Sequence, residues 1–149
     1  MTINCQGNLI DLDRPRVMGI LNQTPDSFFD GGRYSNSKVM LQQVEQMLQA
    51  GASFIDVGGY SSRPGAAEVS TDEELKRVIP TIEAIKSDFP KAIISIDTFR
   101  STVANRAIEA GAAMINDISG GDRDPQIYKV AAKHQVPYIM MHMRGTPQT

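Results

Sequence analysis

Short apolar runs alternate with longer amphipathic segments along most of this 149-residue chain. The runs are rich in Val, Ile and Phe, which is typical of strands buried in a parallel sheet. Between them, apolar residues recur at helical spacing, so the alternation predicts an α/β fold with right-handed crossovers. The expected strands are residues 17–21, 54–57, 92–96, 113–115 and 138–141, and the expected helices lie between 38 and 50, 71 and 85, 100 and 110, and 124 and 133.

Capping residues mark the expected ends of these helices. Gly51 and Gly111 stand where a helix terminus favours a left-handed residue. Thr71 and Glu74 have the spacing of a capping box at a helix start. Pro80 lies within that helix and is expected to kink it, because proline removes one backbone hydrogen bond.

The order of elements favours a barrel over a doubly wound sheet. Several strands end in polar residues, and no glycine-rich dinucleotide or Walker pattern follows any of them. A (β/α)8 TIM barrel takes about 250 residues, so we expect residues 1–149 to form one domain holding about the first five strands. A small hairpin in residues 2–13, turning near Gln6-Gly7-Asn8, precedes them. Either the chain continues beyond Thr149, or the half-barrel must dimerise or misfold.

Composition restricts the class of protein. The net charge is −2 and the 15 basic residues are scattered, which argues against a nucleic-acid surface. No apolar run approaches the length that spans a bilayer, and the N-terminus does not resemble a secretory signal. Cys5 is the only cysteine, so an internal disulfide is excluded. We therefore expect a cytoplasmic protein that contacts neither nucleic acid nor membrane.

Polar residues follow the first two expected strands. Asn22 ends the first strand, and its amide oxygen suits Mg²⁺ that already carries substrate phosphates; an Asn that closes a turn is an equal alternative. Residues 23–37 then form a loop long enough to indicate function. Ser62 and Arg63 follow the second strand. A guanidinium beside a hydroxyl fits a diphosphate or carboxylate, although a lone loop arginine is more often a solvated charge.

The third and fourth strands end in a matching way. Asp97 follows an apolar run and therefore needs a partner, with a helix N-cap as the alternative role. Asn116, followed by Asp117, repeats the arrangement on the next strand. Because these strands are expected to be neighbours, Asp97 and Asn116 could together bind the N–H-rich edge of a flat heterocycle.

The end of the fifth strand is less informative. Met140 is more typical of packing than of metal binding, although a methionine at a barrel mouth could lie against a ring. His142 is compatible with a catalytic or a structural role. His134, at a helix end, is expected to be structural. No catalytic triad or zinc spacing is present.

Taken together, these motifs resemble the dihydropteroate synthase family of pterin-binding barrels. The resemblance covers essentially the whole chain. It is carried by residues 18–22 with 24–28 (MGILN, TPDSF), 61–66 (SSRPGA), 95–98 (SIDT), 115–118 (INDI) and 141–143 (MHM).

The resemblance implies a reaction and roles for individual residues. Dihydropterin-CH2-diphosphate would be joined to p-aminobenzoate, giving 7,8-dihydropteroate and pyrophosphate, in a homodimer that sulfonamides target. The implied roles are Mg²⁺ and diphosphate for Asn22, catalysis for Arg63 and Asp97, and substrate binding for Phe28, Ser62, Arg63, Asp97, Asn116, Ile118 and Met140.

Two departures from the family pattern leave alternatives open. Tyr60 and Ser62 stand where the family usually has Glu and often has Thr. The Lys, the Asp and the Arg-x-His motif that the family draws from its later strands are absent from these 149 residues, so the isolated chain is expected to be inactive. The alternatives are a pterin-binding methyltransferase domain and an inactive half-barrel that serves as a binding or assembly module.

Overall fold

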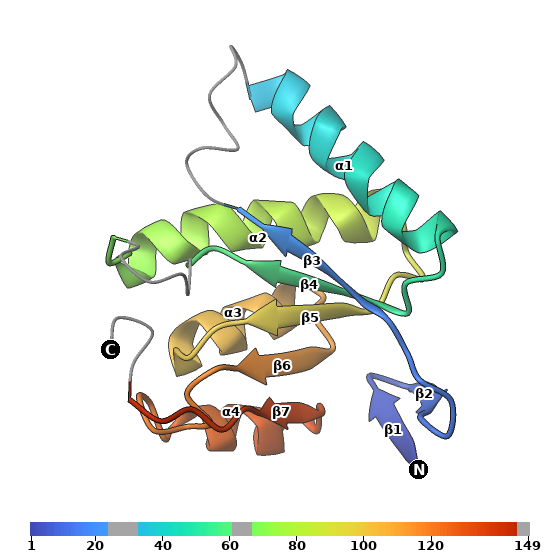
Figure 1. Ribbon diagram of the computed structural model, residues 1–149. Helices are drawn as coiled ribbons and strands as arrows, with labels where there is room; N and C mark the ends of the chain where they lie inside the picture. The colour runs from blue at the N-terminus through green and yellow to red at the C-terminus, as the bar shows by residue number, and fades with distance from the viewer. Residues whose placement is uncertain (24–32, 61–66, 146–149) are drawn as a thin grey trace.

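The computed structural model describes residues 1–23, 33–60 and 67–145, and its centre is a five-stranded parallel sheet. The strands lie side by side in chain order (Figure 1). The predicted α/β class and all five predicted strands are therefore confirmed. The strands are β3 (Met18–Asn22), β4 (Phe54–Gly58), β5 (Ile94–Asp97), β6 (Met114–Asp117) and β7 (Tyr138–Met140).

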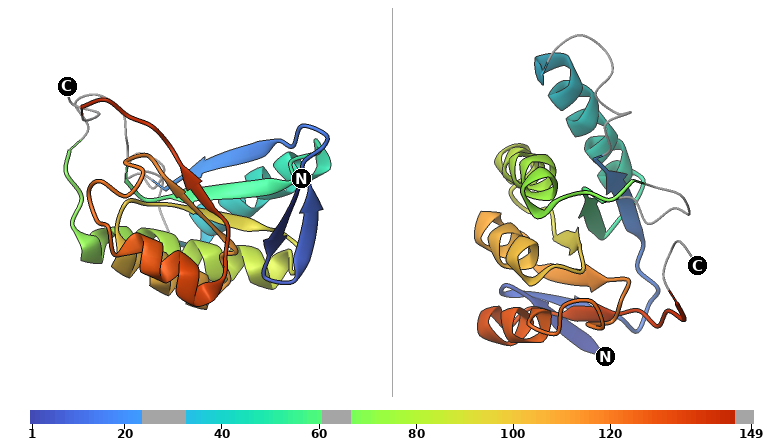
Figure 2. Two further views of the ribbon diagram at one scale, coloured as in Figure 1. Left: turned by 90° about the horizontal axis from the view of Figure 1, so that it is seen from below. Right: turned by 90° about the vertical axis from the view of Figure 1, so that its left-hand side faces the viewer.

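Four helices lie on one face of this sheet, as the right-hand view of Figure 2 shows. They are α1 (Arg33–Gln49), α2 (Thr71–Asp88), α3 (Ser101–Ala110) and α4 (Ile127–His134). Alternate strand residues point towards them and form a dry core, because successive side chains of a strand face opposite sides. This core contains Ile55, Val57, Ile94, Ile96 and Ile115 from the strands and Val78, Ile82, Ile85, Val103 and Ala107 from the helices.

The predicted N-terminal hairpin is confirmed as β1 (Thr2–Cys5) paired antiparallel with β2 (Asn8–Asp11). Its two turn residues, Gln6 and Gly7, both have positive φ, as a tight two-residue hairpin turn requires. The hairpin contributes Cys5, Ile3 and Ile10 to a second apolar cluster at the amino end of the sheet. That end is apolar, whereas the carboxyl ends of the strands carry the polar residues.

Three predicted boundaries were wrong. Helix α1 begins at Arg33, so the connection after Asn22 ends earlier than residue 37. The N-cap of α2 is Ser70 rather than Thr71, because the Ser70 hydroxyl accepts the Glu73 amide. Helix α4 begins at Ile127, since Asp124 starts a turn in front of it. No helix in the described parts of the chain is long and apolar enough to cross a membrane.

Candidate active site

Four residues form a row across the carboxyl ends of the strands. Asn22 pairs in register with Gly58, Gly58 with Asp97, and Asp97 with Asn116. Residues in register point to the same side of a sheet, so this row lies on the face opposite the helices. The expected neighbouring placement of Asp97 and Asn116 is confirmed.

Because Gly58 has no side chain, oxygen atoms of two of these residues lie close to the same point above it. A Cβ atom at Gly58 would lie 3.3 Å from Asp97 Oδ2 and 3.5 Å from Asn22 Oδ1. The missing side chain therefore leaves room for an amide oxygen and a carboxylate oxygen from two non-adjacent strands. This is a small, oxygen-rich opening at the centre of the row.

Asp56 lies one layer below the row on the same face. It is only 3% exposed, and its Oδ2 accepts a 3.1 Å hydrogen bond from Asn116 Nδ2. The sequence pattern does not single out Asp56, because it lies within an otherwise apolar strand. The available signal was its position: Asp56 stands two residues before Gly58, so both face the same side.

Burial governs the charge of these carboxyl groups. Desolvation, reinforced by the nearby charges of Asp56, Glu74 and Asp117, raises the pKa of Asp97 to about 7. Burial also raises the pKa of Asp56. The Ser95 hydroxyl and the Asn116 amide oppose that rise. The Ser95 hydroxyl does so without forming a hydrogen bond of ordinary geometry. Asp97 therefore holds its proton to a much higher pH than an exposed carboxyl group does.

Asp117 belongs to the other face of the sheet, which separates it from Asn116. It is fully buried and accepts four hydrogen bonds, from Ser119 N, Ser119 Oγ, Gly121 N and Tyr138 Oη, at 2.6–2.9 Å. These bonds shape the turn after β6. Asp117 thus organises the turn that carries Ile118.

The rim of the row is aromatic and cationic. The Tyr60 and Phe99 rings meet edge to face with centroids 5.3 Å apart. The guanidinium groups of Arg100 and Arg123 lie 5.0 Å and 4.0 Å from the centre of the Phe99 ring. A cavity of about 20 Å³, room for roughly one water, lies beside Asp97. It is lined by Tyr60, Asp97, Thr98, Phe99, Ile118, Arg123 and Met143.

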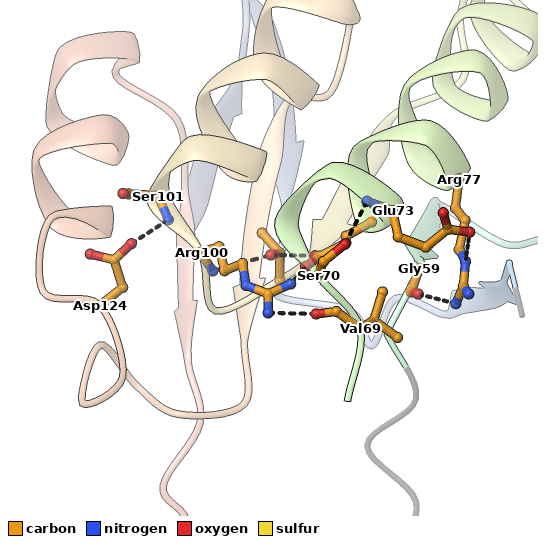
Figure 3. Close-up of polar contacts among 10 residues, drawn as sticks. Gly59, Val69, Ser70, Glu73, Arg77, Arg100, Ser101 and Asp124 are labelled. Carbon is orange, nitrogen blue, oxygen red and sulfur yellow. Dashed lines mark hydrogen bonds and ion pairs between the residues drawn. The ribbon is translucent and has the colours of Figure 1, made fainter. Parts of the chain in front are cut away.

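A buried ion pair holds the turn that follows Asp97. Glu74, on α2, accepts Thr98 Oγ1 at 2.6 Å and the Arg100 guanidinium at 2.7 Å. Arg100 also donates to Val69 O at 2.6 Å, while Arg77 donates to Gly59 O at 3.0 Å. Figure 3 shows both arginines holding backbone carbonyls beside the first turn of α2.

These contacts also decide the alternative role of Asp97. The alternative of Asp97 as a helix N-cap is wrong, because the N-cap position of α3 is Arg100. The Asp124 carboxylate accepts the first amide of that helix, from Ser101, at 2.7 Å (Figure 3). Asp97 is thereby left for the open face.

Other predicted site residues are not all brought to this row. Phe28, Ser62 and Arg63 lie outside the described residues. Met140 is 62% exposed at the end of β7, and it is Met143, rather than Met140, that lines the cavity beside Asp97.

The two histidines lie away from Asp97. His142 is exposed, whereas His134 contacts Asn105 Oδ1 at 2.8 Å, which agrees with its expected structural role.

The oxygen atoms of Asn22 and Asp97 suit a hard cation whose remaining ligands are water or substrate oxygens. Among the described residues, no group of three His, Cys, Asp or Glu side chains is arranged to hold a metal. Asn22 Oδ1 is a neutral oxygen donor, and both it and Asp97 Oδ2 lie within 3.5 Å of the position that a Cβ atom at Gly58 would take. Such a sparse set fits Mg²⁺, which keeps waters and substrate phosphates as its other ligands.

Comparison with known proteins decides the family. A family profile described as pterin binding enzyme matches residues 18–149. The chain belongs to the pterin-binding enzyme family. It is 54% identical over 138 residues to the dihydropteroate synthase of Synechocystis, covering 91% of this chain and 47% of that protein. It is 47% identical over all 149 residues to the enzyme of Escherichia coli, covering 52% of it.

Solved structures of this family share the fold. The dihydropteroate synthase of Vibrio fischeri superposes with a TM-score of 0.85 at 46% identity, covering 98% of this chain and 50% of that one. The Yersinia pestis enzyme, in complex with a sulfonamide drug, gives 0.86 at 48% identity, covering 99% and 53%. The predicted barrel-type fold is confirmed. The chain spans about half the length of the relatives it matches.

Proposed function

We propose that this chain supplies the first part of a dihydropteroate synthase barrel. In this reaction a dihydropterin-CH2-diphosphate is joined to p-aminobenzoate, giving 7,8-dihydropteroate and pyrophosphate. The observation that carries the proposal is the paired placement of Asp97 and Asn116 in register at the strand ends. About 50% identity to dihydropteroate synthases along nearly the whole chain supports it.

Asp97 and Asn116 would bind the edge of the pterin ring. If the bond to diphosphate breaks before the amine attacks, positive charge develops on the pterin. An ionised Asp97 beside the ring favours that charge, because a fixed carboxylate stabilises a developing cation in a site that excludes water. Since the pKa of Asp97 is about 7 without ligand, a cationic ring would also favour its ionised form.

Asn22 would hold Mg²⁺ together with the diphosphate. When bound, the ion supplies positive charge that offsets the charge of the departing diphosphate. Arg63 and Ser62 would donate hydrogen bonds to the diphosphate and p-aminobenzoate, and Phe28 would help to exclude water. Ile118, which lines the cavity beside Asp97, and Met140 would pack against the ring.

The proposal also covers the completion of the barrel, the oligomeric state and the cellular location. Ile20 and Ile139 on the open face are 61% and 36% exposed, which is consistent with burial against further barrel strands. We expect a cytoplasmic homodimer and no turnover by residues 1–149 alone, because the Lys, Arg and His of the family pattern are not among them. Sulfonamides, which bind the Yersinia pestis relative, should compete with p-aminobenzoate.

Formation of dihydropteroate from its two substrates, measured in the full-length protein with Mg²⁺ present, tests the function. Arg63→Ala should cost roughly 2–4 kcal/mol of transition-state stabilisation, as does loss of one preorganised charged contact. Arg106→Ala, at an exposed position on α3, is the control and should leave the rate unchanged. Absence of product in the unaltered protein would refute the function, and an unchanged rate in Arg63→Ala would refute that residue's role.

A further inference from the structure

The hydrogen bond between Asp56 and Asn116 joins a residue with no assigned role to the proposed pterin site. We propose that Asp56 is a positioning residue: it fixes the orientation of the Asn116 amide and thereby sets which heterocycle edge the site accepts. The inference rests on the proposed function, since it concerns the same ring-binding row.

The chemistry of the bond fixes the direction of the amide. An ionised carboxylate only accepts hydrogen bonds, and an amide donates only through its nitrogen. With Asn116 Nδ2 held 3.1 Å from Asp56 Oδ2, the carbonyl arm of the same amide is turned away from Asp56. Without this acceptor the amide could rotate by half a turn and exchange its donor and acceptor ends.

Burial indicates that Asp56 is kept for more than packing. It is 3% exposed, and its second oxygen, Oδ1, makes no hydrogen bond to a described residue. Ser95, its register neighbour on β5, is fully buried and its hydroxyl also has no such partner. Buried polar groups without a hydrogen-bond partner reduce stability. The presence of Asp56 is therefore not explained by stability, and its one hydrogen bond goes to Asn116, a residue of the proposed site.

A fixed amide gives the row a defined hydrogen-bonding pattern. Asp97 supplies an acceptor when ionised, and Asn116 supplies one acceptor and its remaining N–H donor. A heterocycle edge with an exocyclic amine next to a ring nitrogen matches that pattern. A ring with a carbonyl in place of the amine presents an acceptor to an acceptor and should be rejected.

Pterin and lumazine are the probes, because pterin carries an amine at position 2 where lumazine carries a carbonyl, an exchange that also turns the adjacent ring nitrogen N1 from an acceptor into an N–H donor. Their dissociation constants are measured by fluorescence titration of the full-length protein. The unaltered protein should prefer pterin. In Asp56→Ala and in the similarly branched Asp56→Leu, the preference should fall by about tenfold or more, as when a site no longer penalises an unpaired polar group.

Two comparisons separate positioning from general damage. Asp56→Asn keeps one acceptor oxygen but adds an N–H donor, which permits either orientation of the Asn116 amide, so it should lower the preference less than the acceptor-free variants do. Ser95→Ala removes another buried polar group from the same layer and should retain the preference. If the acceptor-free variants bind both rings more weakly but with an unchanged ratio, Asp56 is only structural and the inference is wrong. If the unaltered protein binds pterin but does not prefer it to lumazine, the inference is wrong; if it does not bind pterin at all, the proposed function fails.

Discussion

The two sides of the sheet hold their carboxylates in opposite ways. On the helix side, Asp117 accepts four hydrogen bonds, and Glu74 accepts two that include an ion pair. On the open side, Asp56 accepts one, and Asp97 accepts none from the described residues. Acidic groups with all their partners stabilise the fold, whereas Asp97, which has an oxygen at the opening beside Gly58, remains available to a ligand.

The largest effect should come from the helix side. Glu74→Ala leaves the Arg100 guanidinium and the Thr98 hydroxyl without their partner in a buried setting. We expect a loss of about 3–5 kcal/mol in the free energy of unfolding, as for other broken buried pairs. Urea denaturation of the purified protein measures it.

The neighbouring ion pair on α2 provides a matched control. Glu73 contacts Arg77 at 3.2 Å, but its side chain is 48% exposed. Glu73→Ala should therefore cost less than about 1 kcal/mol. Equal losses in the Glu73 and Glu74 variants would show that burial does not distinguish the two pairs.

The same contrast explains what could be predicted from the sequence. Strand periodicity and the polar residue at each strand end sufficed for the sheet order and for the neighbouring positions of Asp97 and Asn116. The roles proposed for these residues stay predictions. Strand alternation also predicts that Asn116 and Asp117, as successive residues of one strand, point to opposite faces of the sheet.

The partners across long sequence separations could not be predicted. Glu74 looked like a capping residue, and its actual partners, Thr98 and Arg100, lie 24 and 26 residues later in the chain. Asp56 and Asn116 are 60 residues apart. Such contacts depend on how α2 and the strands pack together, which local propensity and spacing do not determine.

An intermediate effect is expected at Asp117. Asp117→Asn replaces one acceptor oxygen by an N–H₂ group that faces donors, so at least one of four buried bonds becomes a repulsive contact. We expect a loss of about 2–3 kcal/mol in the free energy of unfolding. The exposed Asp122→Asn exchange is the control and should stay within about 0.5 kcal/mol. An equally small loss for Asp117→Asn would show that this carboxylate does not stabilise the fold and that it belongs with Asp56 and Asp97.

The smallest effect, with the opposite sign, should come from Asp97. Its folded-state pKa of about 7 lies above the ordinary value of 3.8, so between these pH values the folded protein binds more protons than the unfolded chain. Stability therefore falls as the pH rises from about 4 to about 7, and the whole penalty is present above pH 7. The full shift corresponds to roughly 4 kcal/mol. Solvent at the strand end reduces it, so we expect about 2 kcal/mol.

Asp97→Asn should accordingly make the protein more stable by about 2 kcal/mol at pH 8, with the gain shrinking towards zero near pH 4. Urea denaturation at both pH values measures it, and the exposed Asp88→Asn exchange controls for the loss of one surface charge. The same variant should bind pterin more weakly, because it lacks the carboxylate that the ring edge would contact. A gain in stability with a loss of affinity is the combination expected of a group held for a ligand. A loss of both would instead place Asp97 with Glu74 and Asp117, among the carboxylates that hold the fold.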